Sequence, residues 1–560
     1  MKKLFVTIAI VFAAASCSLK EEFTSYTRQE DFYTNKLQIQ SGINACYNMI
    51  RNIFGGASMW MTTECTTDLM YLDNPTSYPA ILNISPAQPS FSATIWKNCY
   101  NGIMRANAML AAIDEVWEND ILSEEDALQF KAETIVLRAF FYYLLTSSFG
   151  DVPFYTETVT EENREKIASL PRMSADATRD YLIDELSEYV EYLPQKRTYD
   201  APHENRMGAA VGMILAAKFC LWNHRWDDAI DILNRLEDIY GYYEEDPDQF
   251  GRDYLLSDVP FSHKFTPESI FEMQNEYAEY GIQQTATIAM YATPSKSSKA
   301  VVVSGEGAEE GGADEEYIIS DNYNGVCIPE LGANARISIS ARPTKYYFQM
   351  VLPYDSPDLR SGEYSAGASV PRGGSGNLAW RWSGFAANDV ERFPDDRSVR
   401  WFSTTSSKGI NRPWLGNKFW CFGMYYTLDF NNYRIFRFAD ALLMMAEAYL
   451  QSGNADSAMN YLNITRVRAG LPMLTPASTG GNMEALMEEI RMERARELFG
   501  EFQRKFDLVR WGMWYERTTQ YSDGVYINEF IRPCHRYLPI PQDQVTYSHG
   551  ALDNKEYQEN

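Results

Sequence analysis

The sequence predicts a mainly α protein in which a helical-repeat scaffold carries one large insert of irregular, mixed structure. Apolar residues recur every three to four positions over much of residues 36–240 and 434–560, which is the period of amphipathic helices. Two of these helical segments also repeat each other at a constant offset. Between them, residues 241–433 lose the helical period and become rich in Gly, Ser, Pro, Tyr and Trp.

The N-terminus has the organisation of a secretory signal. A basic pair, Lys2–Lys3, precedes the apolar run Leu4–Ala15, and small residues follow, as at a cleavage site. The apolar run is too short to span a bilayer. Cys17 comes directly after the small residues, as in a bacterial lipobox. We therefore expect a lipoprotein signal peptide over residues 1–16 and a tether lipidated at Cys17 over residues 17–35. An ordinary secretory signal with an incidental cysteine is the alternative.

Residues 36–240 are expected to form the first part of the scaffold. Apolar positions predict a helix over Lys36–Phe54, and two glycines end it. Ser123 is followed by acidic residues, which favour the N-terminus of a helix. Pro-rich residues from Met59 to Ser92 predict a long ordered loop. The helix that begins after Ser123 is expected to end at Gly150–Pro153, and further helices are expected over Trp96–Val116 and about Ala175–Tyr192.

The two repeated segments, Met207–Ile239 and Arg434–Ala469, each have the pattern of two helices joined by a short turn. Each is about 34 residues long, which is the period of a tetratricopeptide-type helical hairpin. Small residues at matching positions would let the paired helices approach closely. Chance similarity between two alanine-rich hairpins is the alternative. The matching positions are Ala217, Leu221, Ala229, Leu233 and Asn234 in the first segment, and Ala446, Leu450, Ala458, Leu462 and Asn463 in the second.

Residues 241–433 are expected to form an insert subdomain between the repeats. Short β-branched runs such as Ala300–Val303 lie between turn residues and predict strands. A stretch of this length is too long to be structureless inside a compact domain. Because loops on a rigid scaffold often carry binding residues, we expect ligand-binding loops here. Residues 434–560 would then form the last repeat and a C-terminal region.

Composition and motifs argue against several functions. The net charge of −26 disfavours nucleic acid, since phosphates attract basic surfaces. The eight cysteines contain no Cys-x-x-Cys pair and the five histidines lack ligand spacing, so we expect no metal site and no cofactor. Zinc-protease, nucleophile-elbow and phosphate-loop motifs are absent from the sequence. A glycosidase needs only two suitably placed carboxylates, and 76 acidic residues single out no pair.

The stretch Ile490–Trp511 interleaves charged residues with an apolar stripe. Glu493 and Glu497 lie one helical turn apart among three arginines, and Gly500 interrupts the pattern. Charges beside so many apolar residues predict a partly buried ion network, which costs desolvation free energy unless every member is paired. We expect a structural role. A catalytic role for Glu493 or Glu497 is the alternative.

This stretch also carries a family resemblance. Residues Glu493–Gly512 resemble the C-terminal signature of the SusD/RagB family of Bacteroidetes-type bacteria. Trp96–Ile103, Phe149–Pro153 and Leu538–Pro541 are similar to other segments of that family. The ending Tyr557–Asn560 departs from the commoner family pattern, which concerns only the C-terminal tail.

The resemblance implies a SusD-like fold and a cell-surface, lipid-anchored lipoprotein of the outer membrane. Such a protein captures an oligosaccharide or polysaccharide and delivers it to a SusC-like TonB-dependent transporter, without catalysis. Capture of a peptide is the alternative, and a surface glycoside hydrolase is a further one.

Candidate ligand-binding residues lie in the early loop and in the insert, where the resemblance places binding sites. Aromatic faces suit sugar rings, while Asp and Arg side chains bond hydroxyl groups. For each candidate the alternative is packing in the core. The early candidates are Trp60, Asp68, Tyr71, Asp73 and Trp96, and those of the insert are Tyr291, Tyr323, Arg336, Trp380 and Trp382.

Overall fold

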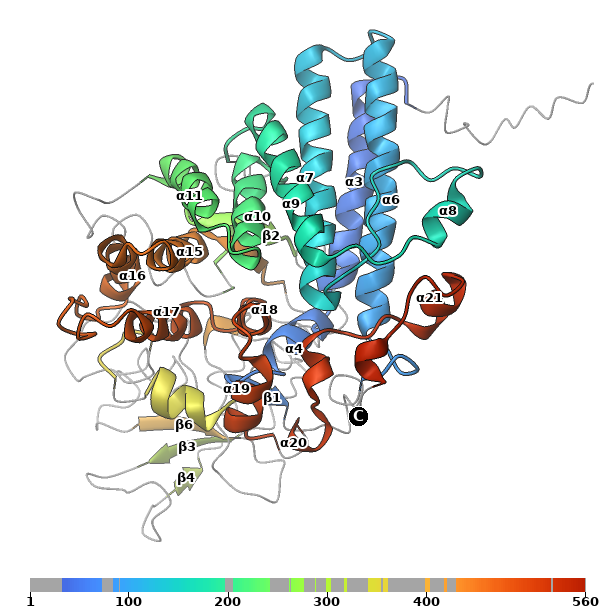
Figure 1. The fold of residues 1–560 in the computed structure, drawn as a ribbon. Coiled ribbons are helices and arrows are strands. Elements are labelled where there is room, and N and C mark those ends of the chain that lie inside the picture. Colours follow the sequence, from blue (N-terminus) through green and yellow to red (C-terminus); the bar gives the residue numbers. More distant parts are fainter. Residues whose placement is uncertain are drawn as a thin grey trace, which may run out of the picture.

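A computed structural model of the chain shows a mainly α protein, as predicted, with long helices on one side and short strands on another (Figure 1). Within the described residues, no helix is both long enough and apolar enough to cross a membrane. The described residues are 33–72, 84–89, 91–196, 205–241, 261, 263–275, 288, 299–303, 317–319, 341–353, 356–360, 398–402, 417–419, 430–524 and 527–558.

The first part of the scaffold consists of long helices packed side by side (Figure 1). Helix α3 (Lys36–Phe54) has the predicted bounds. It packs against α6 (Phe91–Glu118), which in turn packs against α7 (Glu124–Phe149). Gly102 of α6 permits this contact, because a Cβ there would lie 2.3 Å from the Phe141 ring.

The predicted cap of α7 is confirmed, since the Ser123 hydroxyl accepts a hydrogen bond from the Asp126 amide at 3.2 Å. This cap satisfies one of the amides that a helix N-terminus leaves unpaired. A short helix α8 (Arg164–Ala168) and then α9 (Ala175–Tyr189) follow. The predicted helix over Ala175–Tyr192 ends as a 3-10 turn, η3 (Val190–Tyr192).

The two predicted hairpins are present. The first consists of α10 (Ala209–Trp222) and α11 (Trp226–Tyr240). The second consists of α15 (Phe438–Gln451) and α16 (Ala455–Arg468). The offset that relates Ala217 to Ala446 also relates the first residues of the paired helices, and all four matched alanines are fully buried. The repeat therefore reflects structure rather than chance, as a tetratricopeptide-like scaffold requires.

The turns of the two hairpins share one backbone feature. His224 in the first turn and Gly453 in the second have φ angles of 56° and 86°, and both lie at the same place in the repeat. This left-handed conformation costs glycine little and strains a residue with a Cβ. The matching geometry shows that the turn, as well as the helices, is repeated.

The prediction of a long loop from Met59 to Ser92 is wrong for the first part of this stretch. Helix α4 (Ser58–Glu64) occupies it, and β1 (Met70–Leu72) follows and pairs with β5 (Ala341–Pro343). Every residue of α4 from Met59 onward is buried. A short helix that is covered on all sides shows no polar face, so periodicity does not reveal it.

Strands appear within residues 241–433, as the composition predicts. The antiparallel pair of β2 (Ser269–Met273) and β7 (Tyr433–Arg437) leads directly into α15. A separate antiparallel sheet has the order β4–β3–β6, and β3 (Lys299–Val303) contains the predicted run Ala300–Val303. Its other strands are β4 (Tyr317–Ile319) and β6 (Ser398–Phe402).

Short elements complete the described chain around α17 (Met483–Glu497) and α18 (Arg504–Arg510). They are η7 (Tyr347–Val351), η8 (Asn417–Phe419), α19 (Trp514–Tyr521), α20 (Ile527–Phe530), η9 (Pro533–Arg536), α21 (Gln542–Tyr547) and η10 (Lys555–Tyr557).

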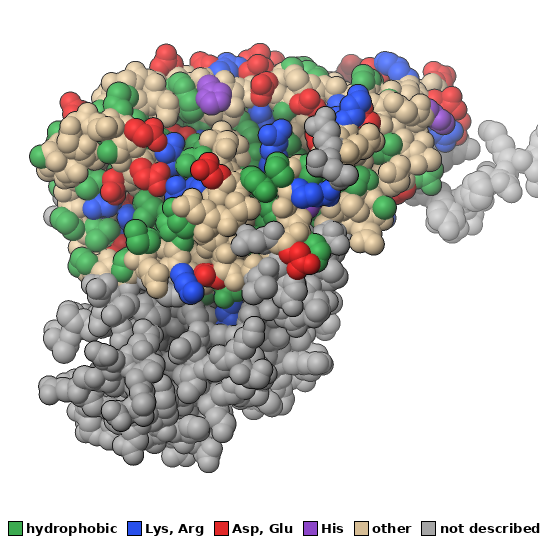
Figure 2. Space-filling view, turned by 60° about the horizontal axis from the view of Figure 1, so that its bottom comes forward, with side chains coloured by type: hydrophobic (Ala, Val, Ile, Leu, Met, Phe, Trp, Pro, Cys, Tyr) green, Lys and Arg blue, Asp and Glu red, His purple; other side chains and the backbone are tan. Residues whose placement is uncertain are grey.

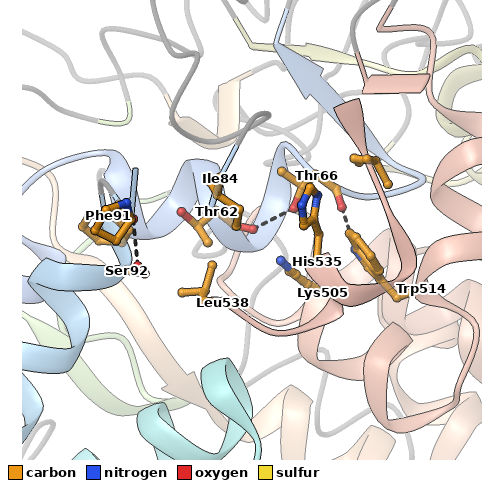
Figure 3. A pocket seen from close by; sticks show the side chains of 11 residues that line it. Thr62, Thr66, Ile84, Phe91, Ser92, Lys505, Trp514, His535 and Leu538 are labelled. Carbon is orange, nitrogen blue, oxygen red and sulfur yellow. Dashed lines mark hydrogen bonds between the residues drawn. The ribbon is translucent and has the colours of Figure 1, made fainter. Parts of the chain in front are cut away.

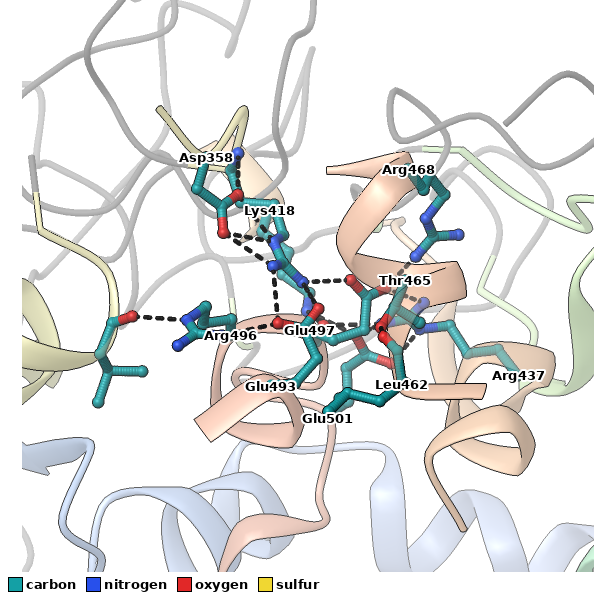
Figure 4. Close-up of polar contacts among 12 residues, drawn as sticks. Asp358, Lys418, Arg437, Leu462, Thr465, Arg468, Glu493, Arg496, Glu497 and Glu501 are labelled. Carbon is teal, nitrogen blue, oxygen red and sulfur yellow. Dashed lines mark hydrogen bonds and ion pairs between the residues drawn. The ribbon is translucent and has the colours of Figure 1, made fainter. Parts of the chain in front are cut away.

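A buried ion network centres on Glu497, the last residue of α17 (Figure 4). One carboxylate oxygen lies 2.6 Å from Arg437 at the end of β7 and also contacts Arg468 at the end of α16. The other oxygen lies 2.7 Å from Arg360. Burial alone would raise the pKa of Glu497, but Arg468, Arg437 and Arg360 together hold it well below its usual range.

A second branch of the network joins α17 to α18 and to the scaffold. Arg494 contacts Asp507 at 2.8 Å and Asp440 at 2.9 Å, and Asp440 also accepts from Lys218. Burial would raise the pKa of Asp440, whereas Lys218 and Arg494 lower it to about 2. The expected ion network is thus present, and it is fully buried rather than arranged along a surface.

Replacing Arg494 with alanine should lower the free energy of unfolding by about 3–5 kcal/mol, because two buried carboxylates, Asp440 and Asp507, each lose one of their cationic partners. Denaturant unfolding measures this change, and ligand affinity of the folded fraction should stay near that of the wild type. The exposed Arg235 on α11 provides the control, where Arg235→Ala should change stability by less than about 0.5 kcal/mol. A loss of ligand binding with unchanged stability would contradict the structural role.

Candidate functional site

Two of the predicted ligand-binding tryptophans are core residues. Trp60 on α4 has no exposed surface, and its indole N–H donates to the Gly500 carbonyl at 3.0 Å. Trp96 on α6 is 4% exposed, and its ring lies 5.0 Å from that of Phe149. A covered ring offers no face to a sugar, so the predicted ligand contact is wrong for both residues in this conformation.

Asp68 likewise has a structural role. It is fully buried, and its carboxylate contacts Arg504 at 2.6 Å and Arg517 at 3.2 Å. Burial would raise the pKa of Asp68, but Arg504 and Arg517 lower it. The carboxylate therefore holds the segment after α4 against α18 and α19, and the predicted ligand contact of Asp68 is corrected.

Tyr71 on β1 is half-buried against a small apolar cluster that includes Trp514 and Ile527. Its position at the edge of the early loop remains compatible with a ligand contact, which stays a prediction. The remaining candidates lie outside the described residues: Asp73, Tyr291, Tyr323, Arg336, Trp380 and Trp382.

A cleft of about 390 Å³, here called the arginine cleft, lies where the C-terminal region meets the end of α7. Leu538 donates its amide to the Ser148 carbonyl and so fixes the strand-like segment after η9 against α7. The Tyr557 hydroxyl donates to the Tyr537 carbonyl at 2.6 Å and ties the tail to the same place. The lining residues include Phe149, Arg172, Arg532, Arg536, Tyr537 and Tyr557.

The charges of the arginine cleft are unevenly paired. Arg172 contacts Asp553 at 2.9 Å and Glu556 at 3.2 Å, which fastens the tail to the loop before α9. Arg532 and Arg536 lie near tyrosine rings, at 6.0 Å and 5.6 Å from the ring centres. The sequence reading missed these residues. The segment Arg532–Tyr537, with two arginines beside a tyrosine in an acidic chain, is the signal that marks them.

A second cleft, of about 460 Å³, lies between α3 and β2. Its lining is mainly amide and guanidinium groups, and of its two aromatic residues Phe271 is buried and Tyr47 half-buried. Phe271 is 3% exposed, and the hydroxyl of Tyr47 is engaged by Glu133 at 2.6 Å. The cleft can bond hydroxyl groups but offers a sugar ring little apolar surface. Lining residues include Asn44, Asn48, Arg51, Asn205, Arg206 and Gln274.

Figure 3 shows a much smaller cavity around Lys505 and His535, close to the arginine cleft. Its volume of about 10 Å³ for a water-sized sphere suits roughly one water molecule. Lys505 is 5% exposed and lies 4.9 Å from the centre of the Trp514 ring. No carboxylate pairs with it among the described residues. Burial lowers the pKa of Lys505 to about 7.

Acidic and basic side chains are interspersed over the described part of the face in Figure 2, which shows no continuous basic surface there. This agrees with the net charge of −26, because phosphate backbones bind to continuous basic surfaces.

Together the fold and the clefts define a helical-repeat scaffold protein with polar surface clefts. The sequence model of the SusD family matches residues 427–557, and the model described as "Starch-binding associating with outer membrane" matches residues 24–221. SusD-like protein P25 of Formosa agariphila is 25% identical, over 99% of this chain and 98% of the relative. The chain belongs to the SusD/RagB family, which confirms the resemblance.

Solved structures share this fold. A SusD superfamily protein of Bacteroides vulgatus superposes with a TM-score of 0.64 at 18% identity, covering 92% of this chain and 98% of that one. Surface glycan-binding protein A of Bacteroides thetaiotaomicron, in complex with laminarihexaose, gives 0.64 at 20% identity, covering 94% and 100%.

Replacing Lys505 with methionine should stabilise the protein near pH 7 and less so at pH 9. The lysine has a pKa of about 7 when folded and about 10.5 when unfolded, so between these values the unfolded chain binds more protons. The free energy of unfolding of the wild type therefore rises with pH over this range, by at most about 1.4 kcal/mol per pH unit. Methionine does not titrate, so the variant lacks this pH dependence. Denaturant unfolding at both pH values measures the difference.

The exposed Lys166 on α8 is the control, and Lys166→Met should show no such pH dependence. If Lys505→Met raised the free energy of unfolding by the same amount at pH 7 and at pH 9, the pKa of Lys505 would not be lowered, and the lysine would stay charged beside a partner group.

Proposed function

We propose that this protein captures an oligosaccharide at the cell surface and passes it to a transporter, without altering the sugar. Family membership carries this proposal: one family model matches each end of the chain, and a relative aligns over nearly its whole length. The description of one matching family names starch binding and the outer membrane, and a structural neighbour is in complex with laminarihexaose. No catalytic motif in the sequence competes with this reading.

The proposed location is the outer face of the outer membrane. Lipid on Cys17 would anchor the chain, and residues 17–35 would act as a tether between the lipid and the folded part of the protein. The proposed partner is a SusC-like TonB-dependent transporter. This protein would cover the transporter, and its opening and closing would deliver the ligand to the transporter.

The proposed sugar contacts are the half-buried Tyr71 and the insert residues Trp380 and Trp382, together with the other insert candidates. Tryptophan offers a broad apolar face with a polar N–H, which matches the alternating faces and hydroxyl groups of a pyranose ring. Residues 241–433 are accordingly proposed as the ligand-binding subdomain, and residues 36–240 and 434–560 as its scaffold.

Replacing Trp380 and Trp382 together with alanine should weaken glycan binding roughly tenfold or more, because two stacking faces are lost. Affinity electrophoresis in gels containing laminarin, and a panel of other polysaccharides, measures retention. Tyr547 on α21 is 68% exposed, so Tyr547→Ala is the matched aromatic control and should leave retention unchanged.

Three other outcomes would change the proposal. Absence of retention in every gel, with peptides co-purifying, would favour peptide capture. Release of shortened sugars from a polysaccharide would identify a hydrolase. Equal losses in the Tyr547 control would remove the insert tryptophans as specific contacts.

Replacing Cys17 with serine should release the protein from the membrane, because the thioether to lipid cannot form. Cell fractionation and mass spectrometry of the mature N-terminus measure this. Wild type should carry a lipidated Cys17 in the membrane fraction. A Cys17→Ser variant that stays fully in that fraction would overturn the lipid anchor.

A further inference from the structure

We propose that the arginine cleft binds the acidic group, a carboxylate or a sulfate ester, of an acidic oligosaccharide. Arg532 and Arg536 would hold the anion, while Tyr537 and Tyr557 would contact the sugar ring. This inference rests on the proposed function in that it takes the ligand to be a sugar. It adds a ligand chemistry and a site whose described lining residues come from outside residues 241–433.

The first argument is the pairing of charges. Several arginines of the core have carboxylate partners, as Arg437 and Arg494 do. In the arginine cleft, Arg172 is the one arginine that pairs in this way with a described carboxylate. Among the described residues no carboxylate lies within ion-pair distance of Arg532 or Arg536, although the chain carries 76 acidic residues. The cleft therefore presents two guanidinium groups that can still bind an anion.

The second argument is the state of His535, which packs beside Arg532. The backbone amide of Arg532 donates to Nδ1 of His535 at 3.3 Å. Nε2 of the same ring lies 3.3 Å from a guanidinium nitrogen of Arg532. A neutral imidazole has one acceptor nitrogen, so it can accept from the amide or from the guanidinium of Arg532, but not from both. In either tautomer the ring carries no negative charge, so it does not neutralise the guanidinium.

The surroundings of His535 indicate a positive local potential. Burial, and then the charges of Arg532 and Lys505, lower the pKa of His535 to about 3. The imidazole is therefore neutral at pH 7, and it adds no charge of its own. Arg532, at the start of η9, keeps its charge beside this neutral ring and favours an anion in the adjoining cleft.

The third argument is the form of the lining. Tyr537 and Tyr557 both line the cleft and are both half-buried, so each keeps part of its side chain accessible. A guanidinium fork can bond two oxygens of one carboxylate or sulfate at once. With a volume of about 390 Å³, the cleft admits a sugar unit together with its acidic group. Glu556, the acidic residue among the described lining residues, is occupied by Arg172.

Isothermal titration calorimetry on the full mature chain tests the proposal with three probes. They are a galacturonic acid oligosaccharide, a sulfated galactose oligosaccharide of similar length, and neutral laminarihexaose. At least one acidic probe should bind. Arg532→Gln with Arg536→Gln should weaken it at least tenfold, because two charge-assisted contacts are lost. Arg536 is exposed, so Arg536→Gln alone preserves the fold and should show a smaller loss.

Lys36→Gln with Lys166→Gln is the matched control, since it removes two exposed positive charges outside the cleft. Equal losses in this control, or unchanged affinity in the arginine variant, would overturn the proposal. Absence of binding by both acidic probes would also overturn it, and if laminarihexaose still binds, the proposed function survives. Failure of all three probes would count against both. Binding of inorganic sulfate as tight as that of the sulfated sugar would identify a site for the anion alone.

Discussion

The buried carboxylate of Glu497 must be paired with positive charges, and the arrangement of the segments around it depends on this constraint. Its partners come from three separate places: Arg437 at the end of β7, Arg468 at the end of α16, and Arg360 in the insert. Desolvating such a group costs several kcal/mol unless its partners are all in place. The three segments must therefore assemble together around α17, and each is held by the others.

This form of attachment differs from apolar packing in its directionality. Burial of apolar surface stabilises a fold without specifying orientation, whereas a guanidinium fork bonds a carboxylate in a fixed plane. Arg360 also contacts Asp358 and Glu493, so the short segment around it has one orientation relative to α17. A few ion pairs thus connect the insert to the repeat scaffold. The proposed ligand-binding loops can then differ in sequence without loosening that connection.

The sequence predicted what depends on neighbours in the chain. The helix Lys36–Phe54, the Ser123 cap and the hairpin repeat follow from periodicity and capping chemistry. It could not separate a buried tryptophan from an exposed one, as Trp60 shows, because aromatic residues serve both roles. Nor could it show that Asp68 pairs with Arg504, which lies 436 residues away. The arginine cleft was missed for the same reason, since its sides come from distant segments.

The acidic character of the whole chain does not oppose an acidic ligand in the arginine cleft. At physiological ionic strength charges are screened over about 8 Å, so the net charge of −26 acts weakly on a group that has entered the cleft. The charges close to the anion therefore matter most. Buried arginines such as Arg437 are surrounded by carboxylates and stabilise the fold. Among the described residues, Arg532 and Arg536 have no carboxylate partner, so an anion in the cleft would meet positive charges that no described carboxylate neutralises.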